Sequence, residues 1–126
     1  MKSLPILLTS SLLLAACSYQ PIAPQLQGKT VAEQNAFLVD ECEDEAWRGH
    51  DSGNHYHNLH KPETQAHKEN MERICHALVK PDADKKTLLA QCKAEAQNKA
   101  AFNNKRLMAE HTARLLEICD GFAQVR

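Results

Sequence analysis

The chain has few of the residues that build a large apolar core or interrupt a helix. Its 126 residues include only six aromatic side chains, four glycines and five prolines. Residues 85–120 contain neither glycine nor proline, and no segment alternates between apolar and polar residues as a strand does. A small domain with so few large apolar side chains has a thin core and usually needs cross-links. We therefore predict an all-α domain over residues 30–126, a hairpin or bundle of three, possibly four, helices stapled by two disulfides.

The chain also lacks an excess of either charge. Its 15 basic and 16 acidic side chains leave a formal net charge of −1. Nucleic-acid binding requires clustered lysine and arginine, so we predict no nucleic-acid partner. No glycine-rich phosphate loop, H-E-x-x-H motif or nucleophile elbow occurs, and we predict that the protein is not an enzyme.

No apolar run is long enough to cross a bilayer as a helix, which takes about 20 residues. The mostly apolar residues 4–16 follow the positive start Met1-Lys2, a build typical of a secretory signal. The run ends in Leu14-Ala15-Ala16-Cys17, which resembles the lipobox of bacterial lipoproteins. The resemblance covers the first 17 residues.

This resemblance implies that residues 1–16 are a signal peptide removed before Cys17, whose thiol carries a diacylglyceryl group and whose new N-terminus is acylated. Two or more acyl chains anchor a protein stably in a membrane. In the lipoproteins that it resembles, an aspartate after the cysteine favours the inner membrane, so Ser18 favours the outer membrane, facing the periplasm. Residues 17–29 contain two prolines and a glycine and are predicted to form a flexible tether.

Local signals delimit the helices. Thr30-Val31-Ala32-Glu33 is a capping box that predicts the start of a first helix, with Val31, Leu38, Cys42 and Ala46 on one face. Gly49 is its predicted end. A second helix is predicted from Pro62 to about residue 80, before Pro81. Its apolar face carries Met71, Ile74, Cys75 and Leu78.

Asp82 or Asp84 can cap a third helix that we predict over residues 85–120, with Gly121 as its stop. We favour a continuous helix over one broken at Asn103-Asn104, because asparagine is a weak helix breaker compared with glycine or proline. The second and third helices would then form a hairpin, and the first would pack along the C-terminal half of the third.

Four cysteines remain once Cys17 is lipidated: Cys42, Cys75, Cys92 and Cys119. An even number of cysteines in a small exported domain predicts disulfides, and four allow three connectivities. The continuous third helix predicts Cys75–Cys92 and Cys42–Cys119. A broken third helix would favour Cys42–Cys92 and Cys75–Cys119 instead.

Histidines concentrate in residues 49–61, predicted as a loop: His50, His55, His57 and His60, with His67 following in the next helix. Alternate side chains of an extended segment point the same way, so His55 and His57 could bind one metal ion with His60 as a third ligand. Imidazole suits Zn, Cu and Ni. The alternative is a solvated loop of biased composition. His76 and His111 stand alone in helices, and we expect both at the surface or its boundary.

These observations predict an envelope lipoprotein that acts as a non-enzymatic binding module for another envelope protein. The alternative is a periplasmic lipoprotein that binds or senses a divalent metal through the histidine loop. The acidic run of residues 40–45 is either a solvated helix face or a surface for a basic partner.

Overall fold

The computed structural model describes residues 20–55, 62–99 and 105–126, except for the side chains of residues 49–55. These ranges contain five helices and no strand, which confirms the all-α prediction with more helices than expected. The helices are α2 (Ile22–Leu26), α3 (Val31–His55), α4 (Pro62–Leu78), α5 (Lys85–Ala96) and α6 (Lys105–Gln124). None of the helices in these ranges is long and apolar enough to cross a membrane.

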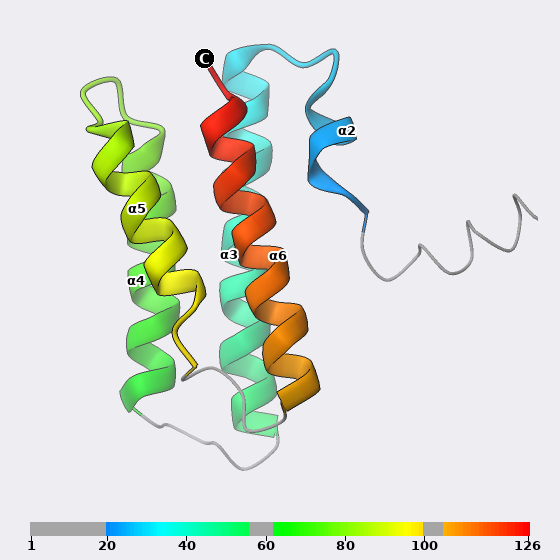
Figure 1. Cartoon of the computed structure of the whole chain (residues 1–126), viewed down its shortest axis with the longest axis vertical. Helices are drawn as coiled ribbons and strands as arrows, with labels where there is room; N and C mark the ends of the chain where they lie inside the picture. Colours follow the sequence, from blue (N-terminus) through cyan, green and yellow to red (C-terminus); the bar gives the residue numbers. More distant parts are fainter. Residues whose placement is uncertain (1–19, 56–61, 100–104) are drawn as a thin grey trace, which may run out of the picture.

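The four longer helices form a bundle in which each packs against two others (Figure 1). Helix α4 lies between α3 and α5, and α6 closes the ring by packing against both α3 and α5. The predicted hairpin of α4 and α5 and the predicted packing of α3 along the C-terminal helix are both present. The short α2 lies outside the ring against α6.

The predicted apolar faces of α3 and α4 form much of the core. Leu38, Cys42 and Ala46 are fully buried in α3, and all four predicted residues of α4 are buried. Val31 is instead 48% exposed, because it is the first residue of α3 and lies beyond the buried part of that face.

Two predicted caps are present. The Thr30 N–H donates to Glu33 Oε1 at 2.8 Å, and the Glu33 N–H donates to Thr30 Oγ1 at 3.1 Å, which completes the capping box. Asp84 caps α5 by accepting from the Thr87 N–H at 3.3 Å.

Neither glycine ends its helix as predicted. Helix α3 continues past Gly49 to His55, because a glycine weakens a helix by about 1 kcal/mol without stopping it. Helix α6 runs through Gly121 to Gln124. Gly121 is a packing position instead: a Cβ atom there would lie 2.6 Å from Leu38 Cδ2 and 3.0 Å from Ile22 Cγ2. Its missing side chain lets α6 approach both α3 and α2.

The continuous third helix was a wrong prediction. Helix α5 ends at Ala96 and α6 begins at Lys105, while Asn103 and Asn104 lie outside the described residues. The two helices run antiparallel and pack together (Figure 1). The break thus lets both segments bury their apolar faces in one core, which a single straight helix of this length could not do.

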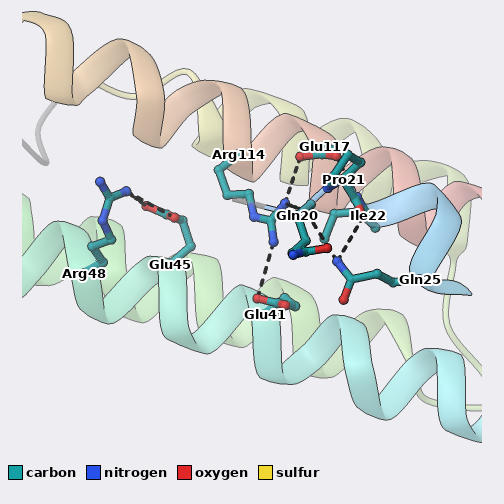
Figure 2. Close-up of polar contacts among 9 residues, drawn as sticks. All are labelled: Gln20, Pro21, Ile22, Gln25, Glu41, Glu45, Arg48, Arg114 and Glu117. Atoms are coloured by element: carbon teal, nitrogen blue, oxygen red, sulfur yellow. Dashed lines mark hydrogen bonds and ion pairs between the residues drawn. The ribbon is translucent and has the colours of Figure 1, made fainter. Parts of the chain in front are cut away.

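The flexible tether was also a wrong prediction over residues 20–29. Ile22 and Leu26, four residues apart on one face of α2, are both buried. The Ile22 N–H donates to Glu117 Oε2 at 2.7 Å, and Arg114 donates to the Gln20 carbonyl at 2.7 Å (Figure 2). Gly28, with φ of +77°, then turns the chain into α3. Residues 17–19 lie outside the described part.

All four cysteines form disulfides, but both predicted pairings are wrong. The bonds are Cys42–Cys75, which joins α3 to α4, and Cys92–Cys119, which joins α5 to α6. This is the third connectivity. A core-facing cysteine has two neighbouring helices in the ring, and helical periodicity does not say which of them it faces.

Candidate functional site

The structure does not test the predicted metal ligands as a set. Helix α3 continues through His50 to His55, so the backbone at His55 is helical and lacks the extended geometry that was expected for His55 and His57. The His55 side chain, His57 and His60 all lie outside the described residues. Within the described part of the chain, no three histidine, cysteine, aspartate or glutamate side chains are placed to hold a metal ion.

The structure instead brings two histidines together in the core. The Nε2 atom of His67, on α4, lies 3.0 Å from the Nε2 atom of His111, on α6. The two side chains are 1% and 0% exposed, and their rings meet edge to face. The surface position predicted for His111 is therefore wrong, whereas His76 is exposed as expected.

A glutamate holds the other nitrogen of each ring. His67 Nδ1 lies 2.6 Å from Glu95 Oε2 on α5, and His111 Nδ1 lies 2.6 Å from Glu45 Oε2 on α3. The four side chains form a continuous line, Glu45–His111–His67–Glu95, to which each helix of the bundle contributes one residue. We call this line the carboxylate–histidine chain.

The two ends of the carboxylate–histidine chain differ in their access to solvent. Glu45 is 3% exposed and pairs with Arg48 at 3.2 Å, an ion pair drawn in Figure 2. Glu95 is 14% exposed and accepts from Asn98 at 2.9 Å and Asn70 at 3.3 Å. Glu95 also lines an open hollow of about 510 Å³ between α4 and α5. Solvent therefore reaches the Glu95 end, while the Glu45 end is enclosed.

The three contacts of the carboxylate–histidine chain, at 2.6, 3.0 and 2.6 Å, all lie within hydrogen-bond distance. Which ring nitrogen donates in each contact is set by the tautomers of the two imidazoles.

Burial lowers the pKa of His67 below its ordinary value, the hydrogen bond and charge of Glu95 oppose this lowering, and the neighbouring His111 adds to it. The buried position of His67 therefore disfavours a positive charge on its ring.

Sequence reasoning missed this site, although a signal was present. His111 lies four residues before the buried Leu115, His67 lies four residues before the buried Met71, and Glu45 follows the buried Cys42 by three residues. All three are thus titratable residues at core-facing positions of an apolar stripe. Buried polar groups need partners, so three such positions indicate an internal network.

A second polar cluster fixes the N-terminal segment to the bundle. Arg114, 6% exposed, lies 3.0 Å from Glu117 and 3.6 Å from Glu41, and it also donates to the Gln20 carbonyl (Figure 2). Residues 17 and 20 can be at most about 11 Å apart along an extended chain. A lipid on Cys17 would thus hold the bundle close to the membrane surface.

The outer face of α3 carries the most exposed large apolar side chain of the described residues. Trp47 is 53% exposed, and the Lys68 ammonium lies 4.7 Å from its ring centroid. Asp40 and Asp44 are also exposed, on the two turns of α3 that precede Trp47.

Comparisons of this chain with protein-family models, with curated proteins and with solved structures gave no match.

Proposed function

We propose that the protein is a lipid-anchored component of the bacterial outer membrane, facing the periplasm, and that it acts as a non-enzymatic binding module for another envelope protein. The exposed Trp47 on α3 carries this proposal. Tryptophan is enriched among the residues that contribute most to protein–protein affinity, because it buries a large area at little entropic cost.

The surroundings of Trp47 favour a protein partner with a basic rim. Asp40 and Asp44 lie seven and three residues before Trp47, so the three side chains share the outer face of α3. Lys68 covers part of the ring, and its flexible side chain can move aside for a partner. Behind this face, the Cys42–Cys75 bond ties α3 to α4, which gives the surface a rigid support.

The proposed lipid anchor on Cys17 is consistent with a protein-binding surface on α3. Because α2 is docked on α6, a lipid on Cys17 would restrict how far the bundle can move from the membrane. The partner would then be another membrane-associated protein, which benefits from the high effective concentration of two proteins at one surface.

Site-specific photo-crosslinking in cells tests the proposal. A photoreactive amino acid at Asp44 should give one discrete adduct with an envelope protein, and Trp47→Ala should reduce its yield at least fivefold. The matched control is the same probe at Lys86, an exposed position on α5. No adduct at residue 44, or the same adducts at residues 44 and 86, would contradict a specific surface on α3.

A further inference from the structure

We propose that the protein binds one long-chain fatty acid in a groove between the end of α5 and the N-terminal half of α6. The acyl chain lies along α6, and the carboxylate lies beside Lys99 and Lys105. This acyl groove is separate from the carboxylate–histidine chain and from the Trp47 surface on α3.

The acyl groove exists because α5 is shorter than the helix beside it. Helix α5 has 12 residues and α6 has 20, so α6 is longer by about 12 Å at 1.5 Å per residue. The two helices are antiparallel, and the Cys92–Cys119 bond fixes their register. The end of α5 therefore lies level with the middle of α6, and the first half of α6 extends beyond it (Figure 1).

The exposed strip of α6 that lines the acyl groove is mostly apolar. It consists of Met108, Ala109, Thr112, Ala113 and Leu116. The groove has a volume of about 830 Å³, within the range of sites for small molecules. It follows α6 for about 16 Å, the length of an extended acyl chain of about a dozen carbons. Ala109 and Ala113, one turn apart and both exposed, leave room for such a chain.

The charge at one end of the acyl groove indicates the head group. Lys99 and Lys105 line the groove where α5 has ended and α6 begins, and both are exposed. None of the described residues that line the groove is acidic. A complementary ligand is therefore apolar along its length and anionic at one end. A fatty acid has this form, because a carboxyl group is ionised at neutral pH.

Two other lipids match the acyl groove less well. The strip runs along a single helix, which suits one acyl chain and not the two chains of a phospholipid. The diacylglyceryl group expected on Cys17 has no anionic end, so it is not complementary to the two lysines.

The docked N-terminal segment would place the acyl groove near a source of fatty acids. The Gln20 carbonyl accepts from Arg114, which directly follows Ala113 of the groove. A lipid on Cys17 would thus hold α6 close to a membrane, into which fatty acids partition. This step rests on the proposed anchor, whereas the shape and charge of the groove do not.

Photo-labelling of the intact mature protein in phosphatidylcholine vesicles tests the proposal. The probe is palmitic acid with a photoreactive diazirine in its acyl chain. Trypsin cleaves after Arg106 and Arg114 and releases residues 107–114, a peptide that holds four of the five groove residues of the strip. We expect most adducts on this peptide. A tenfold excess of unlabelled palmitate should reduce them at least fivefold.

Exposed substitutions separate the acyl chain from the head group. Ala113→Trp fills the groove and should reduce labelling of residues 107–114 at least tenfold, whereas Ala90→Trp, at an exposed position of α5, should leave it unchanged. Reversing both charges at the groove, in Lys99→Glu/Lys105→Glu, should reduce labelling at least fivefold.

The matched control for the reversed charges is Lys80→Glu/Lys86→Glu, which changes the net charge equally at two exposed positions outside the groove. It should label like the unaltered chain. Circular dichroism of each variant verifies that the bundle is intact.

Several results would overturn the proposal. Adducts spread over many peptides, or undiminished in Ala113→Trp, would place the probe elsewhere. Equal labelling by the probe and by its uncharged alcohol would show that the lysines do not select a head group. Stronger competition by lysophosphatidylglycerol than by palmitate would assign the groove to a phosphate lipid. Labelling in vesicles requires neither the anchor on Cys17 nor a protein partner, so it can succeed where those proposals fail.

Discussion

The Nε2 atoms of His67 and His111 lie 3.0 Å apart in the core, although 44 residues separate the two histidines in the chain. The contact joins α4 to α6, which lie at opposite corners of the ring of four helices. Glu45 and Glu95 contact the Nδ1 atoms of the two rings and so extend the line of contacts to α3 and α5. A hydrogen-bonded line across the whole core requires all four helices to be in register, so it couples their packing.

Replacing one member of the carboxylate–histidine chain should destabilise the fold strongly. His111→Leu removes a hydrogen-bond partner from both His67 and Glu45, which are 1% and 3% exposed, and the loss of such a partner costs about 1–3 kcal/mol for each buried group. Urea unfolding followed by circular dichroism measures the change. The control His76→Leu, at a side chain 54% exposed, should change the free energy of unfolding by less than about 0.5 kcal/mol.

Acid should destabilise the protein below about pH 6.5, the ordinary pKa of a histidine. The folded state lowers the pKa of His67, mainly through burial, so below that pH the unfolded chain binds more protons than the folded one. The free energy of unfolding then falls with falling pH, by up to about 1.4 kcal/mol per pH unit for one proton.

Urea unfolding between pH 7 and 5 tests this dependence. The free energy of unfolding should fall less steeply with falling pH in His67→Gln, because glutamine does not titrate at this position. The groups that face His67 remain in that variant: Glu95 and His111 directly, and Glu45 through His111. An equally steep fall in the variant would assign the acid sensitivity to other groups.

Each disulfide should contribute about 3–4 kcal/mol to stability, because the bonds close segments of similar length. The paired cysteines are 33 and 27 residues apart in sequence. The double variants Cys42→Ala/Cys75→Ala and Cys92→Ala/Cys119→Ala should therefore unfold at similarly reduced urea concentrations. Peptide mapping without reductant should recover the Cys42–Cys75 and Cys92–Cys119 pairs, and any other pair would contradict this bundle.

Gly121→Ala should destabilise the protein by about 1–3 kcal/mol, because the added methyl group would lie 2.6 Å from Leu38 Cδ2 and overpack the core. A double-mutant cycle with Leu38→Ala isolates the clash. Leu38→Ala opens the space, so Gly121→Ala should cost much less in that background. Equal costs in both backgrounds would mean that α3 does not limit the approach of α6 here.

Lipidation at Cys17 predicts the mass of the mature protein. Intact-mass analysis of envelope material should find a chain that begins at Cys17 and carries added acyl groups, and Cys17→Ser should abolish the processing. The replacement Ser18→Asp should move the protein from the outer to the inner membrane fraction. A mature chain that begins elsewhere without lipid would contradict both the anchor at Cys17 and the proposal that this anchor holds the bundle near the membrane through α2.

Helical periodicity, caps and cysteine number were sufficient to predict the class of fold and much of the core. Leu38, Met71 and Leu78 are buried because their spacing places them on the apolar stripe of a helix, whatever that stripe packs against. The starts at Thr30 and Asp84 were predictable because a cap acts within a few residues of itself. Such local features depend only on neighbours in the chain, so the sequence by itself determined them.

The tertiary structure decided which partner each core residue meets. Periodicity places Cys42, Cys92, His67 and His111 toward the core, but the rotation and order of the helices decide what each one faces. The break after Ala96 turned α6 back along α5 and brought Cys119 to Cys92 and His111 to His67. A free energy summed over the whole core selects that arrangement, and burying the apolar faces of α5 and α6 outweighs the local preference for one continuous helix.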